Sequence, residues 1–234
     1  MRSFSARSTE TEQMDGETVS EAEFAACLAD LARANYVTLA RPPTIAWLRR
    51  ATRPLKPGNA FSVLDVGFGQ GDMLRAIGRW AANDGLVARL AGIDLNPRSA
   101  PAAAAATDGT LRIAYQTGDV YRTDFDPAPD YVISSLVTHH MSDAEIVRFL
   151  RWMEATARLG WFVNDLHRHW LAFYGFRLLS TVAGWHPFVR HDGPVSVARS
   201  FRRADWLRLL GEAGINSAHI RWRFPFRLCV SRLR

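Results

Sequence analysis

Apolar positions change their spacing along the chain in a regular order, and this order predicts the secondary structure. Short apolar runs typical of buried strands alternate with segments whose apolar residues recur every three to four positions, as on a helix face. Strands are expected over 61–66, 87–93, 112–117, 131–135 and 160–164, and helices over 72–83, 99–107 and 143–157. This alternation predicts a doubly wound α/β fold with a mostly parallel sheet.

The first fifty or so residues follow a different pattern. Residues 1–20 are polar and lack apolar periodicity, so we expect a disordered leader that carries no chemistry. Helical spacing starts at Glu21, and 21–58 is expected to form an N-terminal helical cap that could cover the site.

The remainder, 59–234, is expected to form one domain. A helix over 202–214 and a closing hairpin of strands at 217–223 and 226–230 would bring the sheet to seven strands. The segment 165–198 is dense in Trp, Phe and Tyr, which fits an inserted helical lid over a binding pocket. A helix packed into the core or a subunit interface would give the same pattern, and both readings stay open.

Composition agrees with a single globular domain, because 48% of the 234 residues are hydrophobic. Apolar runs fall far short of the ~20 residues that cross a bilayer, and the start of the chain lacks a secretory signal, so we expect a cytoplasmic protein without a transmembrane segment. Cys27 and Cys229 lack metal-ligand or redox spacing, which predicts buried, inert thiols.

Charge is unevenly distributed along the chain. The formal net charge is +6, yet residues 148–234 alone carry fifteen arginines against five acids. A basic face could meet nucleic acid, an anionic membrane or an acidic substrate. Alternatively the arginines only solvate the surface, since 28 of the 29 basic residues are Arg.

The strongest motif joins the strand at 61–66 to the following helix. Gly67, Gly69 and Gly71 alternate in this turn, and Asp65 stands two residues before the first glycine. Glycines let a ligand approach the backbone closely, but a dinucleotide site has the spacing Gly-x-Gly-x-x-Gly. An acid at this point would repel a pyrophosphate and attract an amino group. The motif therefore favours S-adenosylmethionine.

Two more acids stand at the ends of the next expected strands. Asp94 is placed to accept the ribose hydroxyls, although it could instead cap the helix that follows. Asp119 is placed to accept the adenine amino group. We assign the adjoining Leu95 and Val120, together with Ser135 after the fourth strand, to the same cofactor site.

With these positions in place, 61–164 resembles the Rossmann-like, class I methyltransferases that use S-adenosylmethionine. Within them the chain is similar to small-molecule enzymes of ubiquinone and menaquinone biosynthesis, and of bacterial polyketide and quinone pathways. The latter share Val163-Asn164-Asp165-Leu166, Arg190-His191-Asp192-Gly193-Pro194 and Arg223-Phe224-Pro225-Phe226-Arg227. The resemblance implies S-adenosylhomocysteine as product, a small aromatic or polyketide-derived acceptor, and a monomer or homodimer.

Histidines are the candidates for acceptor chemistry. His139 and His140 follow the fourth strand at the edge where α/β folds bind ligands, and an imidazole can take a proton from a phenol or enol. Adjacent side chains rarely share a pocket, so one is expected to be structural. His191 beside Asp192 competes as base, and the following Gly-Pro suggests a turn. Helical His-x-x-x-His spacing and an acidic partner set are missing, so we expect no metal.

The favoured function is transfer of a methyl group to an acceptor hydroxyl, with positioning supplying much of the acceleration. Methylation of a quinone-like ring carbon would use the same site. A nucleic-acid methyltransferase would use the basic C-terminal third, but the Asn/Asp-Pro-Pro-aromatic motif of base-amine methylation is replaced by Ser134-Ser135-Leu136-Val137, so no nucleic acid is expected. A non-catalytic protein that binds the cofactor is the third alternative.

Overall fold

A computed structural model describes residues 4–13 and 21–234. Seven strands form one sheet in the order β3-β2-β1-β4-β5-β7-β6, in which only β7 runs antiparallel to its neighbours. The strands are β1 (Ala60–Val66), β2 (Val87–Asp94), β3 (Ile113–Thr117), β4 (Tyr131–Ser135), β5 (Gly160–Leu166), β6 (His219–Arg223) and β7 (Arg227–Leu233).

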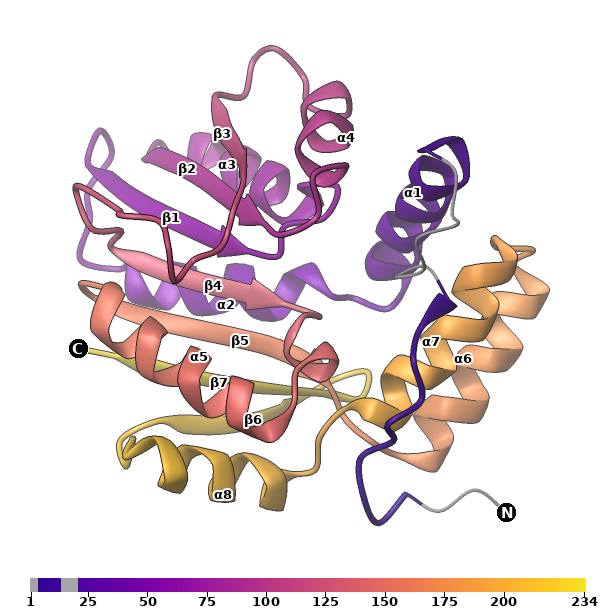
Figure 1. Ribbon diagram of the computed structural model, residues 1–234. Helices are drawn as coiled ribbons and strands as arrows, with labels where there is room; N and C mark the ends of the chain where they lie inside the picture. Colours follow the sequence, from indigo (N-terminus) through magenta and orange to yellow (C-terminus); the bar gives the residue numbers. More distant parts are fainter. Residues whose placement is uncertain (1–3, 14–20) are drawn as a thin grey trace.

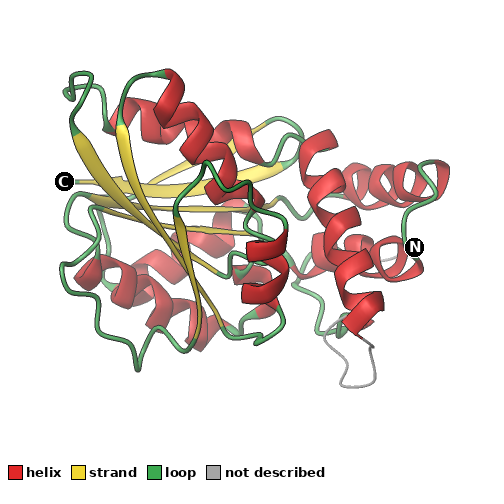
Figure 2. Ribbon diagram, turned by 90° about the horizontal axis from the view of Figure 1, so that it is seen from above, coloured by secondary structure: helices red, strands yellow, loops and turns green. Residues whose placement is uncertain are grey.

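Helices cover both faces of this sheet, and a separate group stands at one end of it (Figures 1 and 2). The helices are α1 (Glu21–Val37), α2 (Arg41–Ala51), α3 (Asp72–Asn83), α4 (Ser99–Ala105), the 3-10 turn η2 (Thr138–His140), α5 (Asp143–Thr156), α6 (Trp170–Val182), α7 (Pro187–Arg199) and α8 (Arg203–Ala213). The predicted doubly wound fold with seven strands is confirmed.

Alternation of side chains along the strands builds two cores. In β1, Val63 belongs to the buried cluster that includes the apolar faces of α2 and α3, whereas Leu64 belongs to the cluster that includes those of α5 and α8. Trp47 of α2 stacks on Phe162 of β5, with ring centroids 5.1 Å apart. The helix α2 therefore belongs to the layer on the sheet, while α1 lies over the end of the sheet beside α7 (Figure 1).

The helix pair α6–α7 replaces the turn expected at Gly193-Pro194. Both residues lie inside α7, so the sequence prediction of a turn is wrong. Glycine is required there because a Cβ on Gly193 would collide with the ring of Phe176 in α6. The missing side chain lets the two helices pack closely beside the sheet edge.

Residues 4–13, which the sequence assigns to the disordered leader, lie along α7 (Figure 1). Arg168, 1% exposed, donates to the carbonyls of Phe4 and Ser5, and Arg7 donates to the carboxylate of Asp143 at 2.7 Å. These arginines supply anchors that apolar periodicity does not reveal. The rest of the leader, 1–3 and 14–20, lies outside the described residues.

The structure also bears on the two cysteines and on the expected lack of a transmembrane segment. Cys27 and Cys229 are buried as predicted, and burial raises the pKa of each thiol to about 12, which disfavours the reactive thiolate. Among the described helices, none has the length and apolarity needed to span a membrane.

Candidate active site

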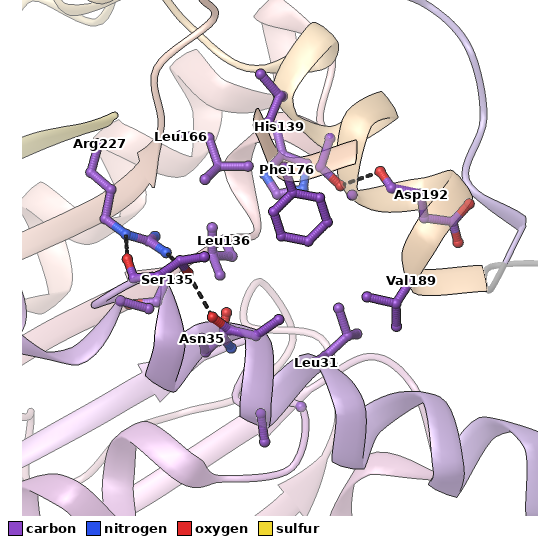
Figure 3. A pocket seen from close by; sticks show the side chains of 18 of the residues that line it. Leu31, Asn35, Ser135, Leu136, His139, Leu166, Phe176, Val189, Asp192 and Arg227 are labelled. Carbon is purple, nitrogen blue, oxygen red and sulfur yellow. Dashed lines mark hydrogen bonds between the residues drawn. The ribbon is translucent and has the colours of Figure 1, made fainter. Parts of the chain in front are cut away.

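A cavity of about 390 Å³ lies at the carboxyl edge of the sheet, between the strand ends and the helices α1, α6 and α7. Apolar side chains make up most of its wall. Leu31 from α1 and Phe176 from α6 point into it from opposite sides (Figure 3). Its polar groups are Glu12, Asp65, Asp72, Ser135, His139, His140, Asp192 and Arg227, together with Asn35, Thr38, Gln70 and Ser196. The cavity is thus a mostly apolar pocket with a smaller number of polar groups in its wall, which is typical of small-molecule sites.

The glycine turn forms one wall of the cavity. Gly67 and Gly69 both line it with positive φ, +73° and +53°, a conformation that disfavours other residues. A Cβ on Gly67 would collide with Val137, but a Cβ on Gly69 would meet nothing within 4 Å. Gly69 therefore turns bare backbone toward open space, where a ligand can approach. Gly71, the third glycine of the motif, is the N-cap of α3 and does not line the cavity.

Asp65 presents a buried carboxylate to the same wall. It is 2% exposed, and its Oδ1 has no hydrogen-bond partner among the described residues. Burial raises the pKa of this carboxyl well above its usual value, and the charges of Asp72 and Asp94 raise it further. A buried acceptor without a donor is costly, so the site fits a ligand that brings a cationic donor.

Both imidazoles of the predicted pair also line the cavity. The tight turn of η2 brings the rings of His139 and His140 together, with centroids 4.3 Å apart. The expectation that only one of them reaches the pocket is therefore wrong. His139 is buried, whereas about a third of the His140 side chain is exposed.

Asp165, at the end of β5, fixes the orientation of His139. Its Oδ1 lies 2.7 Å from Nδ1 of His139, and its Oδ2 accepts the backbone N–H of the same residue. Burial alone would raise the pKa of Asp165, but the imidazole and the hydrogen bonds from Thr138 and Leu166 lower it to about 2. In the sequence, Asp165 stands out only as part of the run Val163-Asn164-Asp165-Leu166. Its contact with His139 depends on the pairing of β4 with β5, which local sequence patterns do not reveal.

Glu12 is the residue that sequence analysis missed altogether. Its carboxylate is buried, and Oε1 accepts the hydroxyl of Ser196 at 2.9 Å. The same Oε1 lies 3.7 Å from Nε2 of His139, and Oε2 lies 3.7 Å from Nε2 of His140. A polar segment far from the motifs thus places a carboxylate beside the histidine pair.

Comparisons with known proteins match part of the chain to a family model and most of it to solved structures. Residues 63–160 match the family described as methyltransferase domain. No curated protein sequence matches the chain significantly. Among solved structures, the chain is similar to the magnesium protoporphyrin IX methyltransferase of Synechocystis with bound S-adenosylmethionine. That match has 15% identity and a TM-score of 0.57, and covers 95% of this chain and 88% of that one.

Two further structures show the same fold. The plantazolicin methyltransferase BpumL, in complex with a triazolic desmethylPZN analog and S-adenosylhomocysteine, matches with 13% identity and a TM-score of 0.62, and the match covers 92% of this chain and 96% of that one. Human N-acetylserotonin methyltransferase, in complex with S-adenosylmethionine, matches with 16% identity and a TM-score of 0.62. The match covers 92% of this chain and 56% of that one.

The chain has a class I methyltransferase fold. The resemblance to class I methyltransferases noted in the sequence is confirmed for the fold. In this methyltransferase fold the cavity occupies the carboxyl edge of the parallel strands, where open α/β sheets bind their ligands.

The acids expected to hold the nucleoside lie at the same edge of the methyltransferase sheet, outside the cavity wall. Asp94 accepts the N–H of Gly69 through Oδ2 and that of Asn96 through Oδ1, each at 2.9 Å, so it braces the glycine turn. Asp119 accepts the N–H of Tyr121, Val120 is buried in the core, and Leu95 is exposed. Their roles toward a nucleoside stay predictions.

Of the remaining predicted site residues, Ser135 lines the cavity and His191 does not. Ser135 lines the cavity at the end of β4, and its buried Oγ has no partner among the described residues. The next residue, Leu136, also lines the cavity and has a φ of +60°, a strained conformation that is common at functional sites. His191 bonds Asp192 at 2.8 Å but does not line the cavity.

Proposed function

We propose that this chain methylates a hydroxyl group of a small aromatic or polyketide-like molecule. Its coarser activity, that of an S-adenosylmethionine-dependent methyltransferase of small molecules, is supported by the matched methyltransferase domain and by the fold. The observation that carries the proposal is one cavity whose wall contains both the glycine turn and the histidine pair.

The cofactor end is assigned to Asp65, Gly67 and Gly69. The unpaired Oδ1 of Asp65 would accept the amino group of the methionine moiety, and the bare backbone at Gly69 would let the cofactor lie against the turn. Asp94 and Asp119 would hold the ribose and the adenine from neighbouring strand ends. When bound, S-adenosylmethionine supplies an activated methyl group and leaves as S-adenosylhomocysteine.

The acceptor end is assigned to the apolar wall and the histidines. Phe176 and Leu31 would hold an aromatic or alkyl-bearing body and exclude water from the reacting group. His139, oriented by Asp165, and His140 would hold the acceptor hydroxyl and promote the loss of its proton. His191 is a poorer candidate because it stands outside the cavity wall.

An acceptor screen tests this proposal. Full-length protein is incubated with methyl-labelled S-adenosylmethionine and hydroxyaromatic or polyketide-like acceptors, and S-adenosylhomocysteine release is followed. We expect turnover with at least one acceptor, and NMR of the product to show a methyl ether. His139→Asn should lower kcat at least tenfold while cofactor binding persists. A C-methyl product would exclude O-methylation, and full activity of His139→Asn would exclude its assigned role.

A further inference from the structure

Three side chains that carry metal-ligand atoms meet in the wall of the cavity, and they come from two distant parts of the chain. One carboxylate oxygen of Glu12 and the ring nitrogens of His139 and His140 all lie within 4.8 Å of one another. The two separations of 3.7 Å between Glu12 oxygens and histidine Nε2 atoms exceed hydrogen-bond distance. They are near the roughly 3.4 Å that separates two ligands of one tetrahedral zinc ion.

The hydrogen bonds around this cluster determine which atoms face each other. Nδ1 of His139 lies against the carboxylate of Asp165, so it carries the proton in the neutral ring and Nε2 presents a lone pair. That lone pair faces the carboxylate of Glu12, which Ser196 holds in place. A cation stabilises two such facing acceptors, and it can be a proton on the ring or a metal ion between the two atoms.

We propose that Glu12, His139 and His140 bind a divalent transition-metal cation. Two imidazoles and one carboxylate suit zinc and its neighbours, whereas magnesium and calcium prefer oxygen ligands alone. Asp165 completes the arrangement, because carboxylates that accept the second N–H of a histidine are the usual outer support of such ligands. Three protein ligands also leave a coordination position open toward the cavity, as catalytic sites do.

This inference deepens the proposed function and, in its chemical role, rests on it. A hydroxyl that fills the open position would lose its proton to solvent near neutral pH, as water does on zinc. The histidine pair would then promote ionisation through the cation. The sequence argued against a metal because the histidines lacked an acidic partner, and Glu12 supplies that partner from an unexpected segment.

Cobalt titration provides the test. Tag-free, full-length protein is treated with a chelator and titrated with CoCl₂, and the visible absorption of bound Co²⁺ is recorded. We expect one equivalent to bind, ZnCl₂ to displace it and MgCl₂ to have no effect. Glu12→Gln and His140→Ala should each weaken binding at least tenfold, and Asp165→Asn about 10- to 100-fold. Glu10→Gln, an exposed carboxylate on the same segment, is the matched control and should bind like the wild type.

The outcomes separate the metal site from the methyltransferase. Absence of cobalt binding by the wild type, or unchanged binding by both Glu12→Gln and His140→Ala, would overturn the site. Calorimetry with S-adenosylhomocysteine on the same variants shows that they remain folded around the cofactor wall. Full methyl transfer by chelated protein would refute the ionising role while the proposed function stands. Cobalt binding without S-adenosylhomocysteine binding would leave the site intact and refute the function.

Discussion

Asp65→Asn should weaken cofactor binding while it stabilises the free protein. The substitution keeps the size of the side chain and removes a charge that is 2% exposed and whose Oδ1 lacks a partner among the described residues. A hydrogen bond to a charged group contributes about 1.5–3 kcal/mol. Its loss would raise the Kd for S-adenosylhomocysteine about 10- to 150-fold, since 1.4 kcal/mol is a factor of ten.

The stability effect has the opposite sign and depends on pH. Burial raises the pKa of Asp65 in the folded protein above its ordinary value of 3.8, so the folded state binds a proton more readily than the unfolded chain does. The stability that this proton provides is complete below pH 3.8 and is lost as pH rises through the folded pKa. Each pKa unit of the rise corresponds to about 1.4 kcal/mol. Asn carries no such dependence, so the advantage of Asp65→Asn should grow with pH above 3.8.

Two measurements check this reasoning. Thermal melting of free wild type and Asp65→Asn between acid and neutral pH gives the stability difference, and calorimetry gives the cofactor affinity. Asp124→Asn, an exposed carboxylate away from the cavity, should leave cofactor affinity unchanged. An Asp65→Asn protein that binds S-adenosylhomocysteine as tightly as the wild type would refute the assignment of Asp65.

Two further substitutions probe the glycine turn. Asp94→Ala should abolish cofactor binding in calorimetry, because it removes both the predicted ribose acceptor and the brace on the N–H of Gly69; unchanged affinity would exclude the ribose assignment. Gly69→Ala should lower stability by about 1–2 kcal/mol through its positive φ, measured by denaturant titration, and should also lose cofactor binding because its methyl group enters the ligand space. Retained cofactor binding would show that the turn does not contact the cofactor.

Local patterns predicted most of the sheet and the glycine turn. The helix over 72–83 and the strand over 131–135 lie at the residues that periodicity indicated, since their apolar faces pack against a sheet that the same pattern defines. Asp65 and Ser135 could be assigned to the cavity because strand ends of a parallel sheet meet at one edge.

Contacts between distant segments could not be predicted in this way. Glu12 reaches the histidine pair because Arg7 and Arg168 anchor a polar segment through carbonyls and carboxylates, and polar anchors leave no periodicity in the sequence. Asp165 meets His139 only through the pairing of β4 with β5. Pro194 suggested a turn, but it lies inside α7, where the neighbouring Gly193 packs closely on Phe176.

A crystal structure with S-adenosylhomocysteine tests the central claim most directly. We predict density across the strand ends, with the amino acid part against Asp65 and the glycine turn, and the ribose beside Asp94. The sulfur should point toward the part of the cavity that contains His139 and His140. Density for the nucleoside elsewhere, or a cavity that stays without it at saturating concentration, would contradict the account.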